Sequence, residues 1–426
     1  MKDYSYFLTC LKKLVSFPSV RGEREENMPF GKPVYLALDY FLSLARDMGF
    51  QCINYDNYAG EIVYGDGEEI GVIGHLDVVP AGNGWATDPF ELTKVGDYYF
   101  ARGIMDDKAP LLACLFALKE LKDSKIKPNR KFRLIVGCNE ESGWEDVEYV
   151  KSKTSFPEYG FSPDGNFPVS YAEKGVAIVT FSLPLPKKFT GTVGGTVINA
   201  VCDRITCKPR FAVKEEDLKK FGLLLTDGGE ILSQGKSAHG SKPELGKNAI
   251  LPLLKYMVSE GENYQRAIDC LFGEENTLSK LTSEQGSVTL SPNLIKQTES
   301  ELLISCDLRF PYPVTMLEIV NLLDNFGLKY TYQVKHPTQY VDKNGEMVTS
   351  LLSVYNSVMG VNEKPQSQSG STFARAFEKG VAFGPEFPGE NTRIHEPNEN
   401  VSETSLKKMY EIYKNAIFSL CNAKNI

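Results

Sequence analysis

The sequence lacks the features that mark several large classes of protein. It has no uninterrupted apolar run long enough to cross a membrane, and its first residues interleave charged with apolar side chains instead of forming a signal peptide. Its nine cysteines include no Cys-x-x-Cys pair and lie mostly in apolar segments, which favours reduced, buried thiols. These absences predict a protein of the reducing cytoplasm that has no membrane partner.

An excess of positive charge is also missing. The chain has 47 Lys and Arg against 55 Asp and Glu, which gives a net charge of −8. An acidic surface argues against nucleic acid or an anionic membrane as a partner. With 426 residues, of which 42% are hydrophobic, the chain is too long for one ordinary domain, and we expect two.

The order of the predicted elements divides the chain into three segments. Over residues 1–174, short β-rich runs alternate with helices, which predicts an α/β domain whose loops gather at strand ends. Residues 175–338 have an α+β pattern, including a strand at Phe211–Val213 and one long helix at about Ala249–Phe272. The α/β pattern returns in residues 339–426. We therefore expect a catalytic domain in two parts, with residues 175–338 inserted as a separate domain.

Acidic residues and histidines stand at the ends of apolar runs, in a set order along the chain. Two histidines with three or more carboxylates can hold a pair of divalent metal ions, and a spare carboxylate can act as a base. The pattern predicts hydrolysis of an amide bond by metal-activated water. The residues concerned are His75, Asp77, Asp106, Asp107, Glu140, Glu141, Asp164 and His395.

Two pairs among these residues suggest divided tasks. Side chains two apart in an extended segment point to the same side, so Asp77 can hold the ring nitrogen of His75 that does not bind metal. Neighbouring side chains diverge, so one of Glu140 and Glu141 can bind a metal ion while the other faces the bound water as general base. The simpler alternative for the two glutamates is a solvated acidic loop.

Simpler interpretations also remain open for the other residues, taken singly. Asp106 and Asp107 begin a predicted helix, where aspartate commonly caps the N-terminus. Asp164 stands in a predicted turn. His239 and His395 lie in polar segments, where a histidine is more often solvated than functional.

Taken together and in order, these residues resemble those of the dinuclear-metal exopeptidases, which include aminoacylases, glutamate carboxypeptidases and succinyl-diaminopimelate desuccinylases. Within that family the chain is most similar to the bacterial dipeptidase V branch. The resemblance implies an α/β catalytic domain with a mixed central sheet flanked by helices, as in zinc exopeptidases, and an inserted α+β lid domain. The matching segments are Arg102-Gly103-x-x-Asp106-Asp107-Lys108-x-Pro110, Glu140-Glu141, Gly160–Asp164, Phe383-Gly384-Pro385-x-Phe387-Pro388-Gly389 and His395-x-x-Asn398-Glu399.

The resemblance also implies a metal ligand set. His75 and Asp164 would bind one ion, Glu141 and His395 would bind the other, and Asp106 would bridge the two. Two divalent ions against three carboxylates and a bridging hydroxide sum to zero charge. Zinc is the first expectation for such ligands, and manganese or cobalt is also compatible.

The remaining roles implied by the resemblance concern catalysis and the substrate. Asp77 would orient His75, Glu140 would be the general base, and His239 of the lid would stabilise the oxyanion. Arg309 would clamp the free carboxylate of the substrate, a task suited to its planar fork of donors. The other expected substrate contacts are Asn199, Gly370 and Ser371.

The activity we expect is that of a dipeptidase, which cleaves short peptides with a free C-terminal carboxylate. An N-acyl-amino-acid deacylase or desuccinylase is the alternative with the same chemistry. A catalytically inactive binding protein that keeps the fold is the alternative from another class. We also expect a monomer, because an insertion of full-domain size could supply both the lid and a substitute for a partner's lid.

Overall fold

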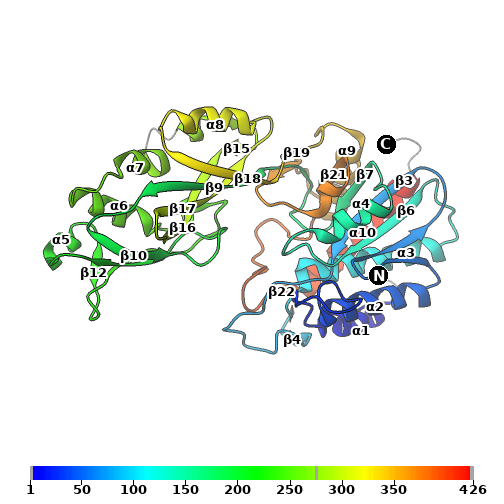
Figure 1. The fold of residues 1–426 in the computed structure, drawn as a ribbon. Helices are drawn as coiled ribbons and strands as arrows, with labels where there is room; N and C mark the ends of the chain where they lie inside the picture. Colours follow the sequence, from blue (N-terminus) through cyan, green and yellow to red (C-terminus); the bar gives the residue numbers. More distant parts are fainter. Residues whose placement is uncertain (1–2, 274–276, 423–426) are drawn as a thin grey trace. The chain divides into compact units, whose positions relative to one another are not determined.

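The structure, a computed structural model, describes residues 3–273 and 277–422, and these form two compact units. Unit 1 consists of the chain up to Tyr171, residues Tyr340–Gln368 and the chain from Thr372 onward. Unit 2 consists of Ala172–Gln339 together with the short segment Ser369–Ser371. The second unit is thus inserted in the sequence of the first, and Figure 1 shows it in green and yellow.

Unit 1 is built on a mixed sheet, as expected. Its strands follow the order β1-β2-β6-β3-β7-β21-β8-β19, and β20 pairs with β8. The centre is parallel, because β3 runs parallel to both β6 and β7, and β7 runs parallel to β21. The strands are β1 (Gln51–Tyr55), β2 (Ala59–Tyr64), β3 (Glu69–His75), β6 (Lys131–Gly137), β7 (Tyr159–Ser162), β8 (Ser170–Glu173), β19 (Gln339–Tyr340), β20 (Gln366–Gln368) and β21 (Lys379–Ala382).

Side chains pack against both faces of this sheet. Gly71 of β3 faces the ring of Phe377, whereas Gly74 of the same strand faces Leu111 and Asp107 on the opposite side. Strands buried on both faces are expected to be rich in apolar residues, as the central parts of β3 and β6 are. The helices of unit 1 are α1 (Tyr4–Val15), α2 (Lys32–Asp47), α3 (Ala109–Asp123), α4 (Glu145–Lys153), α9 (Glu346–Met359) and α10 (Glu403–Asn422).

A small three-stranded sheet also belongs to unit 1. It pairs β22 (Asn400–Ser402) with β5 (Tyr98–Phe100), which in turn pairs with β4 (Thr93–Val95). The sheet joins the segment just before Asp106 to the segment just after His395, which lie far apart in the sequence.

Unit 2 is an antiparallel sheet with its helices packed on a shared apolar core. The strand order is β12-β13-β11-β10-β16-β17-β9-β18. Alternate residues of β9 are buried against apolar residues of α6, α7 and α8, the pattern of a sheet covered on one face. The elements are β9 (Gly175–Pro184), β10 (Phe189–Gly194), β11 (Arg204–Pro209), α5 (Glu215–Lys219), β12 (Leu223–Leu225), β13 (Ile231–Gln234), α6 (Ile250–Ser259), α7 (Gln265–Phe272), β16 (Thr289–Gln297), β17 (Glu301–Phe310), α8 (Met316–Asp324) and β18 (Lys329–His336).

Two predicted elements of this unit were wrong in detail. The single helix expected at Ala249–Phe272 is two helices, because Gly261 has a φ of +94° just after α6, a conformation that suits glycine and ends a helix. The strand expected at Phe211–Val213 is absent, and the neighbouring strand is β11. Periodicity alone does not locate the boundaries of such elements.

The nine cysteines are all free, and all except Cys52 are buried, which confirms the interpretation of them as buried thiols. Within residues 3–273 and 277–422, no helix is both long and apolar enough to cross a membrane.

Candidate metal centre

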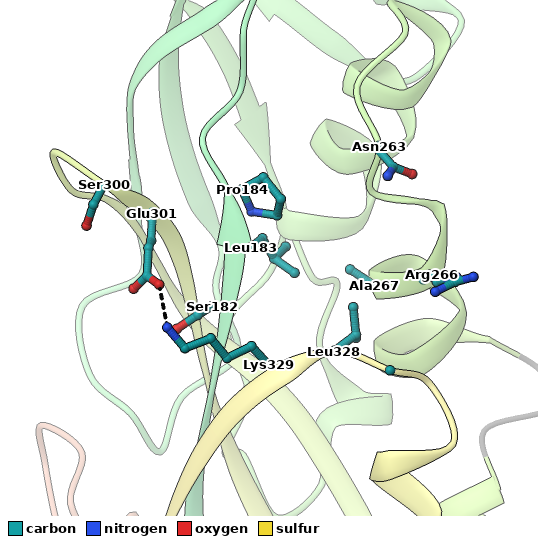
Figure 2. Close-up of a pocket in the computed structure, with 11 residues that line it drawn as sticks. Ser182, Leu183, Pro184, Asn263, Arg266, Ala267, Ser300, Glu301, Leu328 and Lys329 are labelled. Atoms are coloured by element: carbon teal, nitrogen blue, oxygen red, sulfur yellow. Dashed lines mark hydrogen bonds and ion pairs between the residues drawn. The ribbon is translucent and has the colours of Figure 1, made fainter.

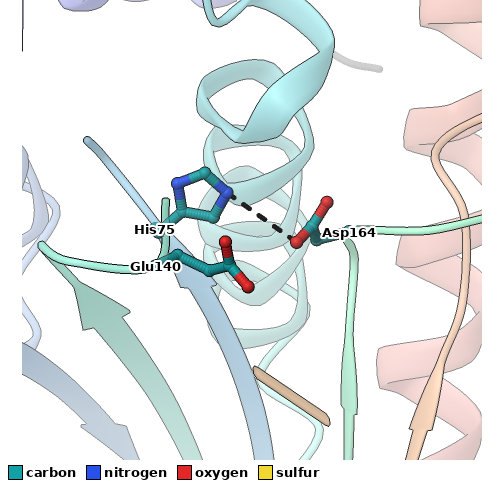
Figure 3. A group of neighbouring side chains, drawn as sticks. All are labelled: His75, Glu140 and Asp164. Carbon is teal, nitrogen blue, oxygen red and sulfur yellow. Dashed lines mark ion pairs between the residues drawn. The ribbon is translucent and has the colours of Figure 1, made fainter. Parts of the chain in front are cut away.

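The ends of three neighbouring parallel strands carry the predicted site residues of unit 1. His75 is the last residue of β3, Glu140 and Glu141 follow β6, and Asp164 follows β7. The carboxyl ends of adjacent parallel strands lie at the same edge of a sheet, where ligands bind in α/β folds. Figure 3 shows His75, Glu140 and Asp164 turned toward one another at this edge.

Asp106 lies between the two histidines. Its Oδ1 is 2.8 Å from Nε2 of His75, and its Oδ2 is 2.8 Å from Nε2 of His395. On the His75 side, Oδ2 of Asp164 lies 3.8 Å from the same Nε2 atom. On the His395 side, Oε2 of Glu141 lies 3.1 Å from Nε2. One carboxylate therefore presents one oxygen to each of two histidine–carboxylate pairs, which is the arrangement of a bridging ligand.

The side chains form two groups, each able to hold one metal ion. His75, Glu140 and Asp164 form the first group, and Asp106, Glu141 and His395 form the second. Within each group the potential ligand atoms lie within 4.8 Å of one another. Glu140, which the sequence suggested as general base, is close enough to the His75 group to bind an ion itself. Its assignment as base stays a prediction.

The electrostatics of this cluster fit bound cations. Burial, followed by repulsion from Asp164, raises the pKa of Glu140 well above its usual range. Burial and the nearby Asp106 raise the pKa of Asp164 to about 8. Burial lowers the pKa of His395, but hydrogen bonds to Asp106 and Glu141 outweigh it and raise that pKa to about 11. Glu140 and Asp164 thus hold protons in the metal-free site, and divalent cations would replace those protons.

Asp77 supports the site through main-chain contacts. Its carbonyl oxygen lies 2.9 Å from Nδ1 of His75, while its carboxylate is farther from the ring, at 3.5 Å. The carboxylate accepts hydrogen bonds from the N–H groups of Glu140 and Glu141, each at 3.1 Å. Asp77 therefore contacts His75 mainly through its backbone, and it also holds the turn that carries the two glutamates.

Two buried carboxylates near the site had no role in the sequence analysis. Asp146 accepts hydrogen bonds from the N–H groups of Cys138 and Asn139, at 2.6 and 2.9 Å, and so holds the start of the Glu140 turn. Glu399 accepts several hydrogen bonds from the segment that carries Asp106. Both are acidic residues buried in the fold. The sequence signals were their nearness to predicted site residues and, for Glu399, its place in the matching segment His395-x-x-Asn398-Glu399.

The predicted catalytic and substrate-binding residues outside the strand ends all belong to unit 2. Asn199 and His239 lie on adjoining segments, since the N–H of Gly240 donates to the Asn199 carbonyl at 2.7 Å and Ala200 forms a β-bridge with His239. Nδ1 of His239 lies 2.7 Å from Oγ of Ser241. The remaining residues are Arg309, Gly370 and Ser371.

Arg309 is already paired within unit 2. Its Nε and Nη2 donate to the two carboxylate oxygens of Asp307, at 2.8 and 3.0 Å, and Nη1 donates to the Ser369 carbonyl at 3.3 Å. A guanidinium has five N–H donors, so donors remain for a substrate carboxylate. The pairing with Asp307 orients the guanidinium and connects it to the segment that contains Gly370 and Ser371.

A separate cavity of about 620 Å³ lies in unit 2, where β9 ends and α7 begins (Figure 2). Lys329 donates a hydrogen bond to Glu301 at 3.0 Å in its wall, and Arg266 lies on the side of α7. None of the residues predicted to act in catalysis, metal binding or substrate binding lines it. The strand-end cluster of unit 1 is therefore the candidate metal centre.

Two comparisons of the sequence with known proteins gave matches over most of the chain. The model of the peptidase family M20/M25/M40 matches residues 71–419. A protein of Staphylococcus aureus strain MW2, named "Putative dipeptidase", is 32% identical over 96% of each chain.

Solved structures share the fold at low sequence identity. Dug1p of Saccharomyces cerevisiae, a dipeptidase, has a TM-score of 0.62 at 13% identity and covers 100% of this chain and 97% of its own. Human carnosine dipeptidase 1 has a TM-score of 0.59 at 15% identity, covering 98% and 97%. The YXEP protein of Bacillus subtilis, described as a dinuclear metal binding peptidase, has a TM-score of 0.55 at 9% identity, covering 98% of both chains. The matched family model spans the whole strand-end cluster, and the chain is a member of the peptidase family M20/M25/M40.

Proposed function

We propose that this chain is a dipeptidase that depends on two divalent metal ions. The observation that carries the proposal is the position of Asp106. One of its carboxylate oxygens lies 2.8 Å from Nε2 of His75, and the other lies 2.8 Å from Nε2 of His395. The Staphylococcus aureus relative supports the choice of dipeptides over other amides.

The residues that would hold the ions are the ones the sequence suggested. His75 and Asp164 would hold one ion, Glu141 and His395 the other, and Asp106 both. Such ions polarise a carbonyl and lower the pKa of water. Zinc is the first choice for these ligands, and manganese or cobalt also suits them.

Glu140 is proposed as the general base. Its carboxylate would take the proton of the attacking water and pass it to the leaving amine. Its pKa is raised in the metal-free site by burial and by Asp164, and nearby cations would lower that pKa toward the working range of a base.

Unit 2 is proposed to supply substrate contacts. Arg309, oriented by Asp307, would bind the C-terminal carboxylate, and Asn199, Gly370 and Ser371 would contact the peptide. His239 would donate a hydrogen bond to the oxyanion. We also propose that the protein acts as a monomer, so that His239 serves a site on its own chain.

The test is a comparison of substrates with metal-reconstituted protein. The proposal expects hydrolysis of free dipeptides and little turnover of N-acetyl or N-succinyl amino acids. Preferential turnover of the acylated amino acids would identify a deacylase of the same family. Tight peptide binding with no bound metal and no hydrolysis would identify a binding protein.

A further inference from the structure

The segment that carries Asp106 departs from regular helical geometry just before α3. Asp106 and Asp107 have non-helical backbone angles, with φ of −126° and −131°, although they stand at the entry to α3. The segment's own contacts include the Ile104 N–H on the Ala101 carbonyl and the Lys108 N–H on the Gly103 carbonyl. Other N–H groups of this turn need acceptors from elsewhere, since buried donors are seldom left unpaired.

A single carboxylate supplies those acceptors. Oε1 of Glu399 accepts from the N–H groups of Met105 and Asp106, at 2.8 and 3.3 Å. Oε2 accepts from the Gly103 N–H at 2.9 Å and from Nη1 of Arg102 at 2.8 Å. Four donors therefore converge on one side chain that is wholly buried. Hydrogen bonds to an ionised acceptor are stronger than hydrogen bonds between neutral groups.

Glu399 also connects the two halves of the metal centre. It stands four residues after His395, and its carbonyl accepts a hydrogen bond from the Ala101 N–H at 3.3 Å. The next residue, Asn400, pairs with Phe100 across the β22–β5 ladder. The segment with one histidine ligand is thus attached to the segment with the proposed bridging ligand.

Arg102 offsets the buried charge of Glu399. Its side chain is 1% exposed, and its guanidinium lies over the ring of Trp85 at 5.3 Å. A buried carboxylate beside Asp106 would otherwise be repelled by it, and the Arg102 guanidinium, which donates to Glu399 at 2.8 Å and to the Ala81 carbonyl at 3.4 Å, offsets that repulsion.

We propose that Glu399, paired with Arg102, is a positioning residue that fixes Asp106 so that its two oxygens serve both metal ions. This inference rests on the proposed two-ion site. It assigns Glu399 no contact with substrate or metal. Its effect is on the orientation of the ligand, as with other groups that hold metal ligands in place.

The competing explanation is that Glu399–Arg102 is a buried ion pair that only stabilises the fold. A matched control exists in unit 1, on the neighbouring strands β2 and β6. Glu61 of β2 and Arg133 of β6 form an ion pair of equal burial, with Nε to Oε1 at 2.6 Å and Nη2 to Oε2 at 2.9 Å. Glu61 is not part of the proposed site.

The experiment measures the zinc dissociation constant of the full-length chain, by competition with a chelator dye, and its melting temperature without metal. Glu399→Gln keeps the shape but replaces one acceptor oxygen with a donor group, and should weaken zinc binding by about 10–100-fold. Glu61→Gln should lower the melting temperature and leave the dissociation constant unchanged. If Glu399→Gln does not fold, Arg102→Lys replaces it and should weaken zinc binding less, in the same direction.

Two results would overturn this inference and leave the proposed function standing. One is a zinc affinity of Glu399→Gln equal to that of the wild type, and the other is a loss of zinc affinity in Glu61→Gln as large as that in Glu399→Gln. A wild-type chain that binds no divalent ion would instead overturn the proposed function, and this inference with it. The wild-type measurement therefore separates the two failures.

Discussion

Glu140 and Glu141 are adjacent in the sequence but have different proposed tasks. Glu140→Ala should reduce turnover by roughly 10²–10⁴-fold and leave both metal ions in place, because a base acts on the proton and not on the metal. Glu141→Ala is the matched control and should lose an ion. Metal content by mass spectrometry and dipeptide turnover provide the measurement. Since Glu140 lies within ligand distance of His75 and Asp164, loss of an ion from Glu140→Ala would mean that the two assignments are reversed.

The titration of the cluster leads to a second prediction at the residue scale. Burial and Asp106 raise the pKa of Asp164 to about 8, and burial first of all raises that of Asp146 to about 7. When a carboxyl group has a higher pKa in the folded chain than in the unfolded chain, the folded chain binds the proton more tightly. The stability that this proton contributes is complete below the unfolded-state pKa, and it is lost as the pH rises through the folded-state pKa. Asp106, whose pKa is lowered, stays ionised in both states above its ordinary value and adds no slope there.

The metal-free chain should therefore lose stability as the pH rises from about 4 to about 8, and zinc should restore it at the upper end. Thermal unfolding in the presence of a chelator, repeated at several pH values, is the measurement. If the melting temperature of the metal-free chain rises over this pH range instead, the prediction is wrong. The negative charges of the site's carboxylates would then be balanced by groups other than metal ions.

At the scale of elements, the end of β6 is packed too closely to accept a side chain. A Cβ on Gly137 would lie 2.3 Å from the ring of Phe373 and 2.7 Å from Oδ2 of Asp146. Gly137→Ala should destabilise the chain by about 1–3 kcal/mol, through overpacking, and should also disturb the turn that carries Glu140. Gly22→Ala is the control in the same unit, because its Cβ would meet only ordinary contacts at 3.8 Å and beyond. Equal stability of the two variants in denaturant unfolding would count against this account of the strand end.

The helices and strands also show how much of the site could be predicted from the sequence. The strand that ends at His75, and the strands that precede Glu140 and Asp164, are apolar runs followed by polar residues, a local pattern that predicts these side chains at strand ends. Glu399 and Arg102 lie 297 positions apart and meet only in the folded chain, so no local pattern marks their pairing. The pairing of Arg309 with Asp307 depends on the pleat of β17, which brings residues two apart to the same side. Gly261, which follows α6 with a φ of +94°, is the local signal in the sequence for the break between α6 and α7.

At the scale of the whole molecule, the proposal of a monomer can be tested through His239. His239→Ala should lower kcat by about 10²–10³-fold without changing metal content, as the loss of an oxyanion donor does. Mixing His239→Ala with Glu140→Ala protein should restore no activity, because each chain then lacks one of the groups it needs. Light scattering should show a single chain at assay concentrations. Activity recovered on mixing would mean that His239 acts on a partner's site in a dimer.

The central claim is that two ions, shared by Asp106, are needed to hydrolyse a dipeptide. The most direct measurement is a titration of the metal-free chain with zinc, in which bound metal and dipeptide turnover are followed in the same samples. The account predicts that turnover rises to its maximum only when two ions are bound per chain. Full turnover with one ion bound, or two bound ions without dipeptide hydrolysis, would contradict it.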